Sequence, residues 1–211
     1  MRRRTFVAAI ATGVVGTTGC LGFVTGDEAY EQEASPVRVD DATLDGTGYS
    51  LDEASEDAID REFEVAGRSR TVRATNQVVQ YHRGIDLPLL GTVEAAVFAV
   101  VATPAFEIAG QTLNPVGEMD NAELAEMVQD EYEELAVDDE VATSSVETLG
   151  EEMVLSQFEG AATFGGTDLD VYVHVGTVRS GGDFAVAVGV YPRGIPDEAA
   201  VVRELVRGLI H

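Results

Sequence analysis

The histidines are the first side chains in this sequence with chemistry to consider. His82, His174 and His211 lie far apart along the chain, and no two have the i, i+4 spacing that would place them on one helix face around a metal. His174 and Tyr172 fall on the same face of an expected strand, where they could line a groove for a small molecule. A helix covering that face could instead bury both side chains in part, as often happens to aromatic residues with a polar tip. The sequence leaves both interpretations open.

Acidic side chains are the next candidates, as calcium ligands. Asp168 and Asp170 offer two carboxylates, and residues 138–140 offer three. Neither group has the spacing of an EF-hand loop, with its central glycine and final glutamate. A surface that is acidic throughout explains these residues without a ligand. We therefore expect no metal site and no cofactor.

Recognisable catalytic motifs are missing from the sequence. It contains no Gly-x-Ser-x-Gly elbow, and a phosphate-binding loop of the usual kind needs a lysine, of which the chain has none. A serine–histidine–aspartate triad stays open, because such triads assemble from distant parts of a chain. The sequence favours a non-catalytic role and leaves enzymatic activity undecided. A small hydrolase with a groove near Tyr172 and His174 is the alternative.

Cys20 is the only cysteine, and its position indicates modification by a lipid. It follows the apolar run Phe6 to Val15 and the small residues Thr17-Thr18-Gly19, an arrangement that resembles the lipobox of prokaryotic lipoproteins. A single acyl chain binds membranes only marginally, so stable anchoring through Cys20 requires a two-chain lipid. Lipidation would leave the exported domain with neither a thiol nor a disulfide.

The residues around the apolar run indicate export. Arg3 and Arg4, followed by Phe6, fit a twin-arginine signal. The run is short for a membrane-spanning helix, which needs about 20 apolar residues. We predict a signal peptide at residues 1–19, a flexible acidic tether at 20–36 and a single domain at 37–211, held by the Cys20 lipid on the extracellular face of the cell membrane. An uncleaved signal that remains as an anchor is the alternative.

The charge of the protein is extreme. Its 38 acidic and 13 basic residues give a net charge of −25, and every basic residue is arginine. Self-repulsion of this size destabilises a compact domain unless salt screens it, and at about 1 M the Debye length is only about 3 Å. The sequence predicts a halophilic protein, with an unusually acidic mesophilic protein as the alternative. It excludes nucleic acid as a partner, because no basic patch could meet phosphate, and leaves an unknown envelope protein as the expected partner.

Residue patterns predict the elements that must position these side chains. Alternation of apolar and polar residues predicts a hairpin from residues 63–65 and 70–81. An unbroken apolar run at 93–102 indicates a central strand that is buried on both faces. Further strands are expected in the following ranges: a small hairpin within 106–113, then 152–164, 168–178 and 184–191.

Helices are expected at two places. Asp120 or Asn121 can cap a helix that runs to about residue 136, and Asp197 can cap a second one. A single helical turn is expected at 40–44, and the acidic stretch 52–60 could be helix or loop. The predicted fold is therefore α+β, a single antiparallel sheet with amphipathic helices at about 120–136 and 197–210 packed on it.

Several segments carry a resemblance to known proteins. They are FEVAG at 63–67, ATNQVVQY at 74–81, NPVGEM at 114–119, DVYVHV at 170–175 and FAVAVGVYP at 184–192. Through them the chain is similar to an uncharacterised family of haloarchaeal lipoproteins with domains of unknown function. The order of the elements resembles the α-β-α sandwich of PsbP-type proteins. These resemblances imply a location and a fold, and supply no catalytic residues.

The function that agrees best with these features is a non-catalytic binding or accessory module, lipid-anchored in a haloarchaeal cell envelope. A small envelope hydrolase is the first alternative. A solute-binding lipoprotein of a transporter is the second, and it is less favoured because one domain leaves no cleft between two lobes.

Overall fold

The computed structural model describes residues 30–65, 68–87, 91–105, 107–108, 111–112, 114–132, 134–164 and 166–211. The predicted signal with Arg3, Arg4 and Phe6, and the predicted lipidation site Cys20, lie outside these ranges. The predicted tether lies outside them up to residue 29. Its residues Tyr30–Glu33 form a strand of the domain, β1.

Most of the described residues are in strands, and eight strands form one sheet. Its strands besides β1 are β3 (Ser50–Val65), β4 (Arg68–Leu87), β5 (Gly91–Pro104), β8 (Leu135–Thr148), β9 (Glu151–Phe164), β10 (Thr167–Ser180) and β11 (Asp183–Pro192). Two short ribbons accompany it, formed by β2 (Arg38–Val39) with β12 (Leu209–Ile210) and by β6 (Glu107–Ile108) with β7 (Gln111–Thr112). The helices described are α2 (Asp41–Thr47), α3 (Asn121–Glu131), α4 (Glu198–Arg207) and the 3₁₀ turn η1 (Pro115–Gly117).

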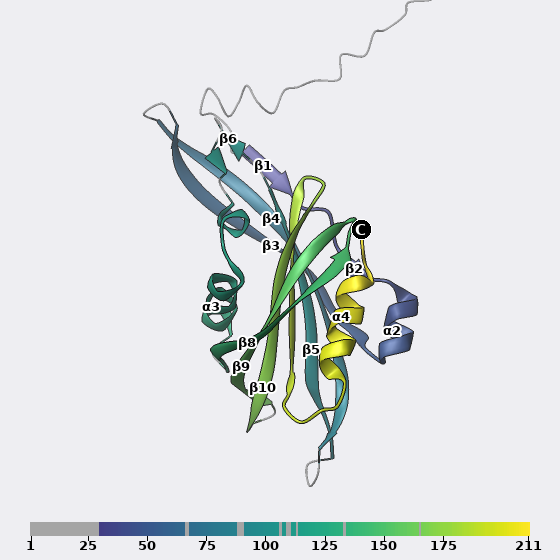
Figure 1. Ribbon diagram of the computed structural model, residues 1–211. Coiled ribbons are helices and arrows are strands. Elements are labelled where there is room, and N and C mark those ends of the chain that lie inside the picture. The colour runs from purple at the N-terminus through teal and green to yellow at the C-terminus, as the bar shows by residue number, and fades with distance from the viewer. Residues whose placement is uncertain are drawn as a thin grey trace, which may run out of the picture.

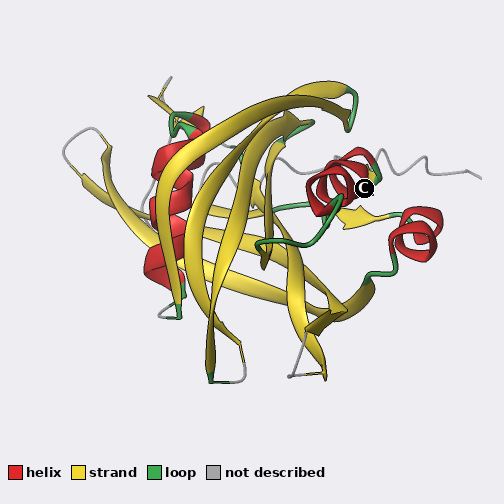
Figure 2. Cartoon of the chain, turned by 60° about the horizontal axis from the view of Figure 1, so that its bottom comes forward, coloured by secondary structure: helices red, strands yellow, loops and turns green. Residues whose placement is uncertain are grey.

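The sheet runs in the order β3-β4-β5-β11-β10-β9-β8. Neighbours along this path are antiparallel, whereas β1 pairs in parallel with Val72 to Thr75 of β4, on the side where β5 pairs further along. The sheet is strongly curved, and Figure 2 shows its strands arching around α4. The paired β3 and β4 extend as a long ribbon beyond the rest of the sheet (Figure 1).

The predicted fold class is wrong. The molecule is mostly β, its large sheet is mixed because β1 is parallel, and the three α-helices in the described part are short. Two strands explain much of the error. Residues 52–60 were expected as helix or loop but belong to β3, and residues 135–136, expected at a helix end, begin β8. Both are outer strands of the sheet, where exposure permits an acidic sequence without regular apolar alternation.

The two faces of the sheet bury two separate cores. On β11, Ala185 and Ala187 face the hollow side, and Phe184 and Val186 face the outer side, as alternation along a strand requires. Helix α4 fills the hollow with Val202, Leu205 and Val206, while α3 packs Leu124, Ala125 and Val128 on the outer face. None of the described helices is long and apolar enough to span a membrane.

Close packing holds α4 in the hollow. A Cβ atom at Gly189 would lie 3.0 Å and 3.2 Å from the methyl groups of Val202, so a glycine at this position lets the helix approach β11. At the other end of α4, β12 pairs with β2, and the backbone N–H of Val39 in β2 donates to the Tyr81 hydroxyl at 2.8 Å. The chain segments before β3 and after α4 are thus joined to each other and to the sheet.

Several local predictions are confirmed. The β3–β4 hairpin, the central strand β5, the small β6–β7 hairpin and the three strands β9, β10 and β11 all form. Asp120 caps α3 and Glu123 completes a capping box. The helix expected at about 197–210 forms as α4 but ends earlier, because Leu209–Ile210 pair with β2 as β12. Asp197 precedes it with a positive φ of 61°, and its side chain makes no capping hydrogen bond.

Candidate functional site

His174 lies in the hollow face of β10, beneath α4, and is 2% exposed. Its Nε2 atom is hydrogen-bonded to the hydroxyl of Tyr191 at 3.0 Å, and the two rings stack with their centroids 5.5 Å apart. Its Nδ1 atom is buried and has no hydrogen-bond partner. Burial, together with the charge of nearby Arg203 on α4, lowers the pKa of His174 to about 4, so the imidazole is neutral near pH 7.

Tyr172 lies on the same face of β10, two residues before His174. Its ring is 5.9 Å from that of Tyr191, and the Arg193 guanidinium lies 5.3 Å from its centroid. Arg193 also pairs with Glu159 at 3.2 Å. The two residues expected to line a groove are therefore covered by packing, Tyr172 in part and His174 almost wholly.

A second buried polar group begins at Glu198, the first residue of α4. This side chain is 1% exposed, accepts a hydrogen bond from the Tyr49 hydroxyl at 2.8 Å, and pairs with the guanidinium of Arg83 on β4. Arg83 also donates to the backbone oxygen of Thr47 at 3.1 Å and lies over the Tyr49 ring. Burial, and then the charge of Glu198, raise the pKa values of Tyr49 and Tyr191 well above the usual range of tyrosine.

Of these two groups, the second fastens α4 to the sheet, because Glu198 lies on the helix and its partner Arg83 lies on β4. Across both groups the tyrosines stay protonated and the histidine stays neutral, while the Glu198 carboxylate has a cation and a hydroxyl as partners. Sequence reasoning missed Glu198, Arg83 and Tyr49. One signal was available, because Glu198 stands four and seven residues before the buried Val202 and Leu205 and thus falls on the apolar stripe of its helix.

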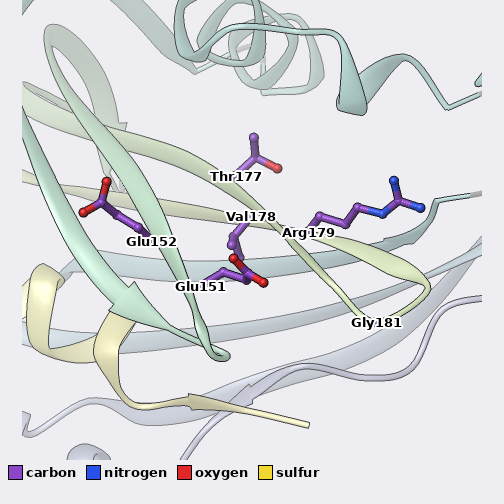
Figure 3. Close-up of a pocket in the computed structure, with 6 residues that line it drawn as sticks. All are labelled: Glu151, Glu152, Thr177, Val178, Arg179 and Gly181. Atoms are coloured by element: carbon purple, nitrogen blue, oxygen red, sulfur yellow. The ribbon is translucent and has the colours of Figure 1, made fainter.

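A pocket that is open to solvent lies elsewhere, between β9 and β10 near the β10–β11 turn. It is a shallow pocket of about 460 Å³, lined by Glu151, Glu152, Thr177, Val178, Arg179 and Gly181. Figure 3 shows the glutamates at the start of β9 and Arg179 extending away from them. Thr177 is among these lining residues, and its hydroxyl oxygen is buried without a hydrogen-bond partner.

A smaller pocket of about 330 Å³ lies between α3 and the sheet. Its lining comprises Ala122, Ala125, Glu126, Gln129, Asp130, Val137, Asp138 and Phe158. The Gln129 side chain accepts a hydrogen bond from the backbone N–H of Val137 at 2.7 Å, which ties the helix to β8. This pocket therefore lies where α3 packs against the outer face of the sheet.

The other histidines and the acidic residues considered as calcium ligands do not come together at one site. His82 lies 3.5 Å from Asp52 and 3.3 Å from Glu94, while His211 contacts Ser180 at 2.8 Å. The carboxylate of Asp168 accepts a hydrogen bond from Thr163. Residues 138–140 lie where the β8–β9 register shifts. In the part of the chain that the structure describes, no three metal-ligating side chains gather at one point.

Comparison with known proteins places the chain in a family. Among curated proteins no relative of this chain is found. A family model described as a domain of unknown function, DUF6517, matches residues 36–210. This range covers nearly all of the described fold, from the residues before β2 to the end of β12. Because the match spans most of its length, the protein belongs to the DUF6517 family.

Proposed function

We propose that this protein is a lipid-anchored, non-catalytic binding module on the outer face of a haloarchaeal cell membrane. The observation that carries the proposal is the placement of Cys20. It is the only cysteine, it follows an apolar run headed by Arg3 and Arg4, and it precedes the first strand of the domain by ten residues. A two-chain lipid on its thiol would hold the domain at the membrane.

The buried polar groups support binding rather than catalysis. A catalytic acid, base or nucleophile has to reach substrate, yet His174 lies buried beneath α4 and the Glu198 side chain is buried at the start of α4. They are hydrogen-bonded to Tyr191 and Tyr49, respectively. The open pocket between β9 and β10 offers exposed charges and strand edges, which suit contact with another chain. An envelope hydrolase with its centre at Tyr172 and His174 gains no support from this arrangement.

The charge supports an extracellular position in concentrated salt. A chain with a net charge of −25 and no lysine needs counter-ions to remain folded, and twin-arginine export suits domains that fold before they cross the membrane. Repulsion from anionic lipid headgroups would keep such a domain off the membrane surface, so attachment depends on the lipid.

The substitution Cys20→Ala tests the proposal. It should move the protein from the membrane fraction into the medium and remove the lipid mass from the N-terminus of the mature chain. Thr25→Ala, outside the lipobox, is the matched control and should remain in membranes. A Cys20→Ala protein that stays membrane-bound, or a wild-type protein whose mass shows no lipid on Cys20, would rule out the lipoprotein anchor.

A further inference from the structure

Strands β9 and β10 separate before either of them ends. They pair from Phe164↔Thr167 as far as Val154↔Thr177. Beyond this point β9 continues back to Glu151 paired only with β8, and β10 continues to Ser180 paired only with β11. All six residues of the two separated segments, 151–153 and 178–180, are described, and no ladder pairing joins them. The 460 Å³ pocket occupies the resulting split.

Packing on both sides fixes the position at which β9 and β10 separate. A Cβ atom at Gly176 would lie 2.8 Å from the Val154 carbonyl oxygen and 3.0 Å from the Met153 sulfur, so the strands approach closely there before they part. Beyond it, β9 turns with β8 towards the hollow, where Val146 and Met153 are buried in the core around α4 and Leu149 packs against it. Because both sides of the split are anchored in a packed core, neither strand is a frayed end.

Paired strands that separate leave backbone donors and acceptors without ladder partners, which is the usual basis for adding a strand from another chain. The outer edges of the sheet discourage such pairing. On β3 the exposed side chains include Glu53, Glu56 and Asp57, and on β8 the register shifts near Glu140 interrupt the ladder. Neither segment of the split contains a register shift, and its exposed acids, Glu151 and Glu152, favour only an added strand that carries positive charge.

We propose that the split between β9 and β10 receives an extended segment of a partner polypeptide that carries adjacent arginine or lysine side chains. Glu151 and Glu152 are exposed, are consecutive on a strand and so point to opposite faces, and take part in no ion pair within the described structure. Consecutive side chains of an inserted strand also point to opposite faces, so two adjacent basic residues would meet the two glutamates.

Arg179 does not already neutralise these glutamates. Its guanidinium lies 5.8 Å from the centroid of Phe184, to which a cation is attracted, and it extends away from the carboxylates in Figure 3. It is free to contact an acidic group or a C-terminal carboxylate elsewhere on the partner. This inference rests on the proposed binding role and does not depend on the Cys20 lipid.

A tethered peptide tests the inference. The Nε2 atom of His211 lies 2.8 Å from the Ser180 hydroxyl, so a flexible Gly-Ser linker added after His211 would hold a strand at high local concentration beside the split. The probe is the segment Thr-Val-Arg-Arg-Val-Thr on the full chain in molar KCl. Its two controls carry Thr-Val-Glu-Glu-Val-Thr and Thr-Pro-Arg-Arg-Pro-Thr, the second of which cannot donate to a ladder at its prolines.

Amide hydrogen exchange is the measurement. Amides of residues 151–153 and 178–180 that exchange rapidly in the unextended protein should slow by about ten-fold with the arginine strand, if its local concentration is about ten times the dissociation constant. Neither control strand should slow them. In the arginine fusion, replacing both Glu151 and Glu152 by Gln should restore fast exchange, whereas Glu53→Gln with Glu56→Gln on β3 should leave the protection intact.

The proposal is overturned if the arginine strand protects none of these amides, if all three strands protect them equally, or if protection appears at another edge of the sheet. Such a result would leave the lipid anchor untouched, since Cys20→Ala is measured by release from membranes. Retention of Cys20→Ala in membranes would in turn leave the exchange result standing.

Discussion

His174 is a residue whose environment, rather than its chemical type, determines what it does. An imidazole in an open groove is a base near neutral pH, but beneath α4 it is a neutral, stacked ring with one unpartnered nitrogen. The nearby charge is Arg203 on α4, and the ring partner on β11 is the protonated Tyr191. A proton added to this ring would therefore gain no buried anion as a partner within its immediate contacts.

The buried imidazole predicts acid sensitivity. Its pKa is about 4 in the folded protein against an ordinary 6.5, so the unfolded chain binds the proton first as pH falls from about 6.5 to 4. The free energy of unfolding should fall across this window, by up to about 3 kcal/mol at about 1.36 kcal/mol per pKa unit, and the effect should be complete below about pH 4. Thermal unfolding of wild type and His174→Gln, compared at pH 7 and pH 4.5 in molar KCl, measures it.

The Gln variant removes the titration and keeps a group able to bond to Tyr191. It should lose less stability on acidification than wild type, while carboxylate protonation affects both proteins alike. Equal losses in the two proteins would show that His174 does not carry the pH dependence.

The candidate site was predictable from sequence only in part. Strand alternation places Tyr172 and His174 on one face, and both the groove and the helix-covered face followed from that pattern. The choice between them depends on α4, which packs on β10 from more than twenty residues further along the chain, and local patterns do not encode that contact. The contacts of Arg83 and Tyr49 could not be predicted for the same reason, since their partner Glu198 is over a hundred residues away in the sequence.

At the scale of elements, the ion pair between Glu198 and Arg83 links α4 to β4, across the hollow of the sheet. Glu198 is 1% exposed, whereas the Arg83 side chain is 22% exposed, so removal of the carboxylate leaves a largely desolvated guanidinium and the Tyr49 hydroxyl without their partner. Removal of one member of a buried ion pair costs about 3–5 kcal/mol, whereas replacement of both by apolar groups is often nearly neutral.

We therefore expect Glu198→Ala to lower the free energy of unfolding by about 3 kcal/mol and the double variant Glu198→Leu, Arg83→Met to lower it by less. Tyr49→Phe should cost about 1.5–3 kcal/mol, the range for a hydrogen bond to a charged group. Denaturant unfolding followed by circular dichroism in molar KCl gives all three values. If the double variant were less stable than Glu198→Ala, the ion pair would not be the main link between α4 and the sheet.

The elements themselves show where sequence patterns carry information. Apolar patterns located β9, β10 and β11, through alternation on β10 and through a continuous apolar run on β11, and the capping residues located the start of α3. The same patterns did not predict residues 52–60 of β3 or the start of β8. The acidic residues of these strands lie exposed at the edges of the sheet and do not pack in a core. Residues 30–33, at the C-terminal end of the expected tether, form β1, because their polar sequence joins the sheet through backbone pairing with β4.

For the whole molecule, the acidic surface predicts dependence on salt. With a net charge of −25, lowering the ionic strength lengthens the screening distance and raises the repulsion within the folded state. Dialysis from molar KCl into low-salt buffer should abolish the near-UV circular dichroism, which comes from tyrosine and phenylalanine since the chain has no tryptophan.

A variant with three exposed β3 acids neutralised, Glu53→Gln, Glu56→Gln and Asp57→Asn, should keep its near-UV signal to lower salt than wild type. Retention of the full wild-type signal without salt would contradict a halophilic origin of the charge.

The pairing of β2 with β12 has a consequence for the order of events during synthesis. Leu209 and Ile210 pair with Val39 and Arg38, which precede them by more than 160 residues, so this ribbon cannot close until residues 209–210 have left the ribosome. Contacts of such long sequence separation form late and slowly. An N-terminal export signal would therefore be exposed well before the domain is complete. The twin-arginine route accepts folded proteins, so export by that route would follow closure of the β2–β12 ribbon. The closed ribbon would then distinguish a completely folded domain from an incomplete one.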